Sequence, residues 1–283
     1  MIGIVGTVPD QRFPLVHGPA RVVGHELKIE GYTVPVNRGT PALISAAATA
    51  AEHLGAQDVY AFLIGDIGKG DGSRRLYQFL SDRLREFHFE VLTFHYLQPD
   101  ADWHNKVLFA MDEMSQRPIL IADAGFMYAA KMSGQAARYD FFTPDVGELA
   151  FLADETAPHP FYTRGFILHR NEEIPELIER AYNHNNAAVH LLVKSKSDHI
   201  AKEKQIVGMV DSPSFDAMEA IGGTGDSLTG LLSAYLGAGL TPLDAAVKAA
   251  KTNRWTGHFV PPTPATQIAE LIQKIPRAMA EIL

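Results

Sequence analysis

The stretch Gly222-Gly223-Thr224-Gly225-Asp226 leads into a segment with helical spacing over residues 227–236. Glycines allow several backbone N–H groups to converge on one point, and the N-terminus of the following helix adds partial positive charge. The stretch therefore predicts a binding site for a phosphate group or a developing oxyanion. A carboxylate at the start of that helix can act as a base toward a substrate hydroxyl, so we expect Asp226 to be the catalytic residue.

The same residues are also compatible with a tight turn in which Asp226 only caps the helix. A P-loop would need a lysine and a hydroxyl residue after its second glycine, and a dinucleotide fingerprint would follow the first strand. Neither pattern occurs around Gly222. The motif alone therefore leaves two interpretations, and only the surrounding chain can distinguish them.

Strand-like and helix-like segments alternate along the chain. Predicted strands, which are apolar and end in turn residues, cover residues 2–8, 58–64, 89–94, 118–122, 140–144 and 187–193. Predicted helices, which repeat apolar residues at helical spacing, cover residues 40–54, 73–85, 100–114, 126–133, 146–153, 173–183, 227–236 and 242–253. This alternation predicts an α/β fold with a mostly parallel central sheet.

The chain shows no obvious linker, so we expect a single domain over residues 1–283. Irregular alternation over residues 22–36 predicts a hairpin, which would form a small lid or a sheet edge within residues 20–37. A second hairpin is expected within residues 194–210. Gly55 stands where a helix C-terminal glycine is expected, and Thr241 is well placed to cap the helix that follows it.

Composition limits the class of protein. The formal net charge is −8 and no stretch interleaves basic and aromatic residues densely, so nucleic acid is not expected as a partner. The absence of cysteine excludes disulfides and thiolate chemistry. The N-terminal residues do not resemble a signal peptide and no apolar stretch is long enough to span a membrane, so we expect a cytoplasmic protein without membrane contact. Whether it forms a homo-oligomer stays open.

The segment 220–249, with its Gly-Gly-Thr-Gly-Asp motif, resembles the C-terminal signature of the ribokinase-like superfamily. It is most similar to the ADP- or ATP-dependent NAD(P)H-hydrate dehydratases, a carbohydrate-kinase-related family. Five further segments resemble motifs of that family in the same order: Gly39-Thr40-Pro41-Ala42-Leu43, Ile64-Gly65-Asp66-Ile67-Gly68, Ile121-Ala122-Asp123-Ala124, Thr143-Pro144-Asp145-Val146-Gly147-Glu148 and Leu191-Leu192-Val193-Lys194-Ser195. The resemblance covers about two-thirds of the chain, which makes coincidence an unsatisfactory explanation.

The resemblance implies a three-layer αβα ribokinase-like fold in which nucleotide and substrate meet at the loops after the strands. It implies ADP or ATP together with Mg²⁺ as cofactors, a small-molecule substrate, and Asp226 as the acid/base residue. The residues that it implies near the nucleotide are Gly222, Gly223, Thr224, Gly225 and Lys194. Those that it implies near the substrate or a Mg²⁺-linked water network are Asp123, Asp145, Gly147 and Glu148.

The chain departs from the family pattern in four places. Asp145 and Val146 replace a histidine and a proline, Asp66 puts a carboxylate into an otherwise uncharged turn, and Ser195 replaces a glycine. The stretch between Gly65 and Asp123 is also longer than in the family, which predicts an insertion around residues 89–104. These departures lie mainly on the substrate side of the expected site.

Other chemistry-bearing residues have two interpretations each. Asp71, Arg74 and Arg75 follow a glycine-rich turn and could bind phosphate or form a solvated helix start. Trp103, His104 and Asn105 could line a ligand pocket or pack in the interior. Other scattered histidines show no metal-ligand spacing, so no histidine metal site is expected; among them are His95, His159, His169, His184, His190, His199 and His258.

Three functions are compatible with these features. The first is a nucleotide-dependent hydro-lyase, which would phosphorylate the hydroxyl of a hydrated nicotinamide nucleotide and then eliminate phosphate. The second is a small-molecule kinase, favoured by residues 6–10 and by the hairpin at 22–36, which resemble the substrate-side aspartate and lid of sugar kinases. The third is a non-catalytic nucleotide-binding protein.

Overall fold

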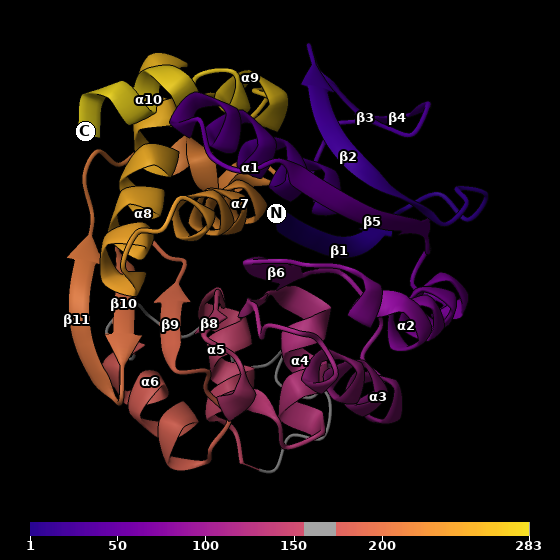
Figure 1. The fold of residues 1–283 in the computed structure, drawn as a ribbon. Helices are drawn as coiled ribbons and strands as arrows, with labels where there is room; N and C mark the ends of the chain where they lie inside the picture. Colours follow the sequence, from indigo (N-terminus) through magenta and orange to yellow (C-terminus); the bar gives the residue numbers. More distant parts are fainter. Residues whose placement is uncertain (156–173, 283) are drawn as a thin grey trace.

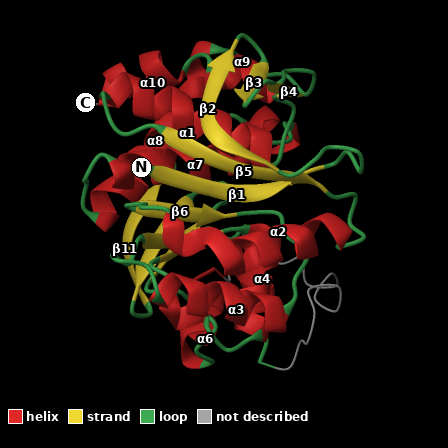
Figure 2. Ribbon diagram, turned by 45° about the vertical axis from the view of Figure 1, so that its right-hand side comes forward, coloured by secondary structure: helices red, strands yellow, loops and turns green. Residues whose placement is uncertain are grey.

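The computed structural model describes residues 1–155 and 174–282, and these form one sheet between two layers of helices (Figure 1, Figure 2). Six parallel strands make up the centre of the sheet, in the spatial order β9 (His190–Val193), β8 (Phe141–Phe142), β7 (Ile119–Ala122), β6 (Val91–Phe94), β1 (Ile2–Val8) and β5 (Val59–Gly65). The predicted three-layer α/β fold with a mostly parallel sheet is confirmed.

Antiparallel strands extend this sheet at both ends. Beyond β9 lie β10 (Asp198–Lys202) and β11 (Gln205–Val210), which form the hairpin expected within residues 194–210. Beyond β5 lie β2 (Val16–Val23), β3 (Glu26–Ile29) and β4 (Tyr32–Pro35). The hairpin expected at 22–36 is therefore part of a three-stranded meander that begins earlier and forms a sheet edge.

Each face of the sheet carries its own helix layer and its own apolar cluster. One layer consists of α1 (Thr40–Leu54), α7 (Thr224–Gly237), α8 (Pro242–Phe259), α9 (Ile268–Ile272) and α10 (Ile275–Ile282). The other consists of α2 (Asp71–Arg83), α3 (Ala101–Asp112), α4 (Ala124–Met132), α5 (Val146–Ala153) and α6 (Ile174–Asn183). Successive parallel strands are connected through these helices, as the alternation of segments predicted.

Local chemistry sets several helix ends. Helix α1 covers the predicted residues 40–54 and ends at Gly55, whose φ of 60° is left-handed. Thr241 caps α8 by accepting a hydrogen bond from the Asp244 N–H at 3.3 Å. Helix α4 begins two residues earlier than expected, because the Asp123 side chain accepts the Ala124 N–H at 2.9 Å.

The strand expected over residues 89–94 is confirmed, whereas the insertion expected around residues 89–104 relative to the family stays a prediction. Residues Val91–Phe94 form β6, which pairs with β1 on one side and β7 on the other and is buried along its whole length. The strand expected over 140–144 is also shorter and contains only Phe141 and Phe142. Glu173, the expected start of α6, lies outside the described residues.

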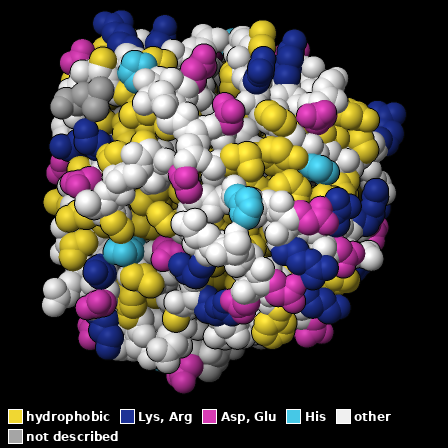
Figure 3. Space-filling view, viewed as in Figure 1, with side chains coloured by type: hydrophobic (Ala, Val, Ile, Leu, Met, Phe, Trp, Pro, Cys, Tyr) yellow, Lys and Arg dark blue, Asp and Glu magenta, His cyan; other side chains and the backbone are white. Residues whose placement is uncertain are grey.

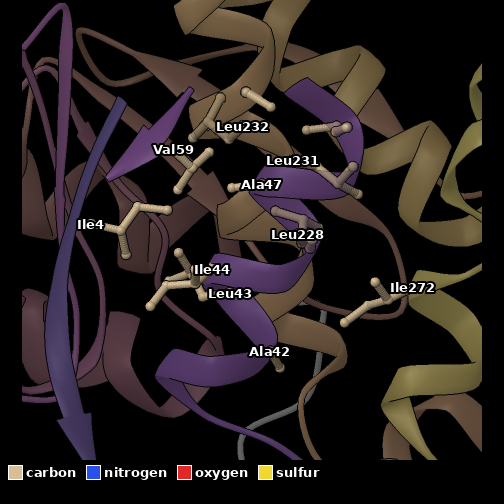
Figure 4. Close-up of a cluster of buried hydrophobic side chains, with 14 of the residues drawn as sticks. Ile4, Ala42, Leu43, Ile44, Ala47, Val59, Leu228, Leu231, Leu232 and Ile272 are labelled. Atoms are coloured by element: carbon tan, nitrogen blue, oxygen red, sulfur yellow. The ribbon is translucent and has the colours of Figure 1, made fainter. Parts of the chain in front are cut away.

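Helices α1 and α7 cross at unusually short range (Figure 4). An ideal Cβ atom on Gly230 of α7 would lie 2.2 Å from the Leu43 carbonyl oxygen and 3.0 Å from the Ala47 nitrogen in α1. The facing positions of α1 are small, since Ala46, Ala47 and Ala50 are fully buried there. The alanine-rich sequence of α1 and the glycine in α7 together permit this close approach.

The surface features of the described residues are ordinary. Lys and Arg side chains are interspersed with Asp and Glu over the face drawn in Figure 3. None of the described helices combines the length and apolarity needed to cross a bilayer. The expectations of a cytoplasmic protein without nucleic-acid partners stay predictions.

Replacing Gly230 by alanine should destabilise the protein, although alanine favours helix formation by about 1 kcal/mol over glycine. The added methyl group would meet the Leu43 backbone, which cannot move aside as a flexible side chain can. We expect the free energy of unfolding to fall by roughly 1–3 kcal/mol, measured by denaturant unfolding. Gly208→Ala is the control, because its Cβ would lie 3.3 Å from a side-chain atom of Leu243. A Gly230→Ala protein as stable as the control would contradict the role assigned to this contact.

Candidate active site

Two adjoining pockets lie at the carboxyl ends of the parallel strands. The larger has a volume of about 740 Å³ and is lined by the Gly222–Asp226 stretch and by residues that follow β6, β7, β8 and β9. The smaller, of about 560 Å³, is lined by residues that follow β1 and β5 and by the start of α1. Both pockets share Arg38, Tyr96, Ala124 and Glu148, so they form one continuous groove. This is where ligands bind in open α/β sheets.

The glycine stretch forms the start of α7. Gly223 is its N-cap with a φ of 105°, and no side chain of the described residues caps this helix end. An ideal Cβ on Gly223 would lie 2.9 Å from Ile268, and one on Gly225 would lie 3.3 Å from Lys194. Asp226 stands in the first turn and Gly223 is the N-cap, so the interpretation in which Asp226 caps the helix is wrong. The uncapped first turn suits an anion.

Asp226 is held in place from two sides. Its Oδ2 atom accepts the Gly39 N–H at 2.6 Å, and its Oδ1 atom lies 3.1 Å from His95 Nε2. Burial acts to raise the pKa of Asp226, but the contacts with His95, the charge of Lys194 and the Gly39 N–H lower it below its ordinary value. The carboxylate is therefore ionised at neutral pH and can accept a proton.

His95 is a site residue that the sequence analysis did not single out. It is fully buried, and its Nδ1 atom lies 3.0 Å from Thr40 Oγ1. Its position was readable in principle, because His95 directly follows a strand, as Asp123 does. The sequence analysis considered His95 only as a metal ligand and therefore did not connect it with Asp226.

Lys194 and Asp123 form a buried ion pair beneath the glycine stretch. The Lys194 ammonium donates to both carboxylate oxygens of Asp123, at 2.8 and 3.0 Å. Thr229 Oγ1 of α7 donates to the same carboxylate at 2.7 Å. Burial acts to lower the pKa of Lys194, but the charges of Asp123 and Glu148 raise it above its ordinary value. Lys194 therefore stays charged and lines the larger pocket.

Asp145 and Glu148 form a reciprocal cap at the start of α5. Asp145 Oδ1 accepts the Glu148 N–H at 2.7 Å, and Glu148 Oε2 accepts the Asp145 N–H at 2.8 Å. The Tyr128 hydroxyl donates to Glu148 Oε1 at 3.2 Å. Burial, followed by the charge of Asp145, raises the pKa of Glu148 to about 8. Both residues and Gly147 line the larger pocket, so two carboxyl groups lie on this wall.

Among the described residues, His95 is the histidine that lies beside two carboxylates close enough to share a metal ion. A ring nitrogen of His95 and carboxylate oxygens of Asp123 and Asp226 lie within 4.8 Å of one another. Sequence spacing could not show this group, because its members come from three distant segments. Lys194 neutralises Asp123, and the Asp226 carboxylate accepts the Gly39 N–H and lies 3.1 Å from His95 Nε2, so these carboxylates already have polar partners. His159 and His169 lie outside the described residues.

The Asp66 carboxylate accepts hydrogen bonds from the backbone of its own glycine-rich turn, residues 65–72. Its carboxylate accepts the N–H groups of Gly68, Lys69 and Gly70 at 2.9–3.1 Å, and both the N–H and the hydroxyl of Ser73. Burial acts to raise the pKa of Asp66, but these hydrogen bonds lower it below its ordinary value. The departure from the family pattern at Asp66 is thus a self-capped turn.

The other candidates lie away from the groove. Asp71 and Arg74 form an exposed pair at 3.4 Å, and neither of them nor Arg75 lines either pocket, which favours a solvated helix start. His104 is buried between Tyr139 and Ser133, at 2.7 and 2.9 Å. Trp103 and Asn105 line neither pocket, so the packing interpretation holds for this segment.

Comparison with known proteins gives a family and a fold. A family model described as NAD(P)H-hydrate dehydratase (Carb_kinase) matches residues 99–277. An uncharacterized protein of Methanocaldococcus jannaschii is 38% identical over 242 residues, which cover 85% of this chain and 100% of that protein.

Solved structures agree on the fold at low sequence identity. Escherichia coli phosphofructokinase-2 in complex with fructose-6-phosphate has a TM-score of 0.56 at 13% identity, with 99% of both chains covered. Staphylococcus aureus pyridoxal kinase has a TM-score of 0.56 at 12% identity, with 89% of this chain and 86% of that chain covered. A ribokinase-like superfamily protein of Enterococcus faecalis has a TM-score of 0.55 at 16% identity, with coverages of 99% and 86%. The ribokinase-like fold is confirmed.

Replacing Lys194 by methionine should strongly destabilise the protein, because Asp123 is 1% exposed and would lose its cation. We expect a loss of roughly 3–5 kcal/mol in the free energy of unfolding, measured by denaturant titration. Adding Asp123→Asn to this variant should recover part of the loss by removing the unpaired charge. Lys196→Met is the control, since its side chain is 61% exposed and reaches Asp216 only at 3.9 Å. Equal losses for Lys194→Met and the control would contradict this interpretation.

Glu148 should make stability fall as the pH rises. Because its folded-state pKa is raised to about 8, its contribution is present below the unfolded-state pKa and is lost as the pH rises through 8. We therefore expect Glu148→Gln to flatten the decline of the thermal midpoint between about pH 5 and pH 8. The measurement is thermal unfolding across this range, without divalent cations. An unchanged slope in the variant would show that Glu148 does not titrate in this way.

Proposed function

Since the chain belongs to the NAD(P)H-hydrate dehydratase (Carb_kinase) family, we propose that it transfers a phosphoryl group from ADP or ATP to a hydroxyl group of a small molecule. One observation carries this proposal. An ionised carboxylate, Asp226, lies in the first turn of an uncapped helix and is held there by Gly39, which lines the adjoining smaller pocket. The base and the anion site therefore lie where the larger pocket, which we assign to the nucleotide, meets the smaller pocket, which we assign to the acceptor.

The residues have distinct parts in this step. The N–H groups of Gly222, Gly223, Thr224 and Gly225 would bind the phosphates of the nucleotide, and Lys194 would lie beneath them in the larger pocket. The acceptor would occupy the smaller pocket, against Thr7, Pro9 and Tyr96. Asp226 would take the proton of the acceptor hydroxyl as its oxygen attacks phosphorus.

The wall formed by Asp145 and Glu148 fits a Mg²⁺ ion. The Glu148 carboxyl, whose pKa is raised by burial and then by the charge of Asp145, would be held in its ionised form by a bound cation, whereas the Asp123 charge is already neutralised by Lys194. Oxygen donors of this kind suit the hard cation. Bound there, Mg²⁺ would neutralise charge on the phosphate oxygens. Asp145 and Glu148 would hold the ion directly or through water, while Asp123 would keep Lys194 in place.

The chemistry of the acceptor decides whether the phosphate ester is the final product or an intermediate that loses phosphate. A stable ester would make the chain a small-molecule kinase, and the β2–β4 edge together with Thr7 and Pro9 in the acceptor pocket favours this reaction. An ester at a hydrated nicotinamide ring could instead lose phosphate and give the reduced nicotinamide, and the family match favours this second reaction. Both reactions use the same Asp226 base. The ordered contacts around Asp226 argue against a protein that only binds nucleotide.

Assays can separate the two reactions directly. Purified protein with Mg²⁺ and either nucleotide is offered hydrated NADH and, separately, a panel of sugars and other alcohols. Return of the reduced-nicotinamide absorbance would identify the dehydratase, and a phosphorylated alcohol detected by mass spectrometry would identify the kinase. If neither product forms, while nucleotide still raises the thermal midpoint, the binding-only function replaces both.

Asp226→Asn should abolish the reaction without abolishing nucleotide binding. The amide cannot accept the proton, so we expect kcat to fall by roughly 10²–10⁴-fold, measured with whichever acceptor is phosphorylated. The Kd of the nucleotide should change little. Asp82→Asn, a change of the same charge at an exposed residue of α2, is the control. A variant that retains wild-type kcat would rule out Asp226 as the base.

A further inference from the structure

Arg38 lies at the junction of the two pockets and lines both of them. It directly precedes Gly39, whose N–H holds the Asp226 carboxylate at 2.6 Å. Its side chain runs beside the glycine stretch, since an ideal Cβ on Gly222 would lie 3.6 Å from Arg38 Cβ and 3.5 Å from Arg38 Cδ. The backbone of Arg38 is therefore tied to the base, and its side chain is adjacent to the anion site.

Arg38 also differs electrostatically from the other basic residues of the groove. Lysine and arginine contribute four lining residues, and three of them have an acidic partner among the described residues. Lys194 pairs with Asp123 at 2.8 Å, Arg254 with Asp198 at 2.8 Å, and Lys196 with Asp216 at 3.9 Å. Within residues 1–155 and 174–282, the exposed Arg38 has neither an ion pair nor a side-chain hydrogen bond.

An unpaired guanidinium in this position is unusual because the groove is rich in carboxylates. Asp123, Asp145, Glu148 and Asp226 all line it, yet none binds Arg38. A guanidinium presents several donors in a plane and matches phosphate geometry well. Its charge is free for a ligand that arrives between the pockets, and in the proposed reaction that ligand is the group in transfer.

We propose that Arg38 binds the transferring phosphoryl group and stabilises its charge in the transition state. This rests on the proposed phosphoryl transfer and adds a catalytic residue to it. The acceptor oxygen forms a bond to the terminal phosphorus, and the bond from phosphorus to the bridging oxygen breaks. That electron pair leaves with the shortened nucleotide, and the hydroxyl proton goes to Asp226. Arg38 donates hydrogen bonds to the non-bridging oxygens throughout this step.

The role predicts a specific pattern of losses. A residue that acts only in the transition state changes kcat and leaves nucleotide affinity almost unchanged. We expect Arg38→Gln to lower kcat by about 10³-fold and to alter the Kd of MgADP by less than about threefold. Arg38→Lys keeps the charge but loses the planar donors, so its kcat should lie between those of wild type and Arg38→Gln.

A binding experiment tests the same role without an identified acceptor. Thermal midpoints are measured for the whole protein with MgADP alone and with aluminium fluoride added to MgADP and, in parallel, to MgAMP, because AMP is the leaving nucleotide when ADP is the donor; aluminium fluoride mimics the phosphoryl group in transfer. Wild type should gain stability from MgADP and a further shift from aluminium fluoride, whereas Arg38→Gln should keep the first shift and lose the second. Arg21→Gln, at an exposed arginine of β2 outside both pockets, is the control and should behave as wild type.

The other outcomes overturn the inference in distinguishable ways. If Arg38→Gln loses the MgADP shift as well, the residue binds nucleotide in the ground state and not the transferring group. If Arg38→Gln keeps both shifts, or if wild type gains nothing from aluminium fluoride, Arg38 has no part in phosphoryl transfer. Failure of wild type to bind MgADP at all would instead refute the proposed function itself.

Discussion

The close crossing of α1 and α7 is the contact on which the groove depends. Gly230 lets the two helices approach until the α7 backbone touches the α1 backbone at Leu43. This distance brings the N-terminal ends of both helices together, so that the Gly39 N–H reaches Asp226. Arg38 lies beside the glycine stretch for the same reason. A wider crossing, which any side chain at residue 230 would require, would separate the base from the pocket proposed for the acceptor.

Ionisation of the carboxyl groups in the groove depends mainly on their ion-pair and hydrogen-bond partners. Asp123 and Asp226 are both largely buried, yet Lys194 neutralises the first, and His95 and Gly39 stabilise the ionised second. Burial, followed by the charge of Asp145, raises the pKa of Glu148 to about 8, although the Lys194 charge acts to lower it. Carboxylates of one groove thus differ in their readiness to accept a proton or a metal ion. In the proposed reaction, Asp226 suits the base and Glu148 suits a site for Mg²⁺.

Much of the fold could be predicted from the sequence, because its physical causes lie between residues that are close together in the chain. The strand and helix periodicities, Gly55 after α1 and Thr241 before α8 depend on neighbouring residues in the chain. The strand β6 was expected over residues 89–94, but the role of His95 just after it was not, because the sequence does not show which strand ends lie side by side. The carboxylate of Asp66 was noticed as a departure, but its capping of five donors becomes visible only in three dimensions.

The sequence by itself determined the class of fold and the order of the motifs, because both follow from patterns between residues close together in the chain. It also singled out Asp226, because the ordered family motifs along the chain favoured a base over a simple helix cap at this position. Tertiary structure alone decided that Lys194 pairs with Asp123, that His95 contacts Asp226, and that Arg38 has no acidic partner among the described residues. Those relations join residues from different strand ends and helices, and only the packing of the sheet and of α1 against α7 sets the distances between them.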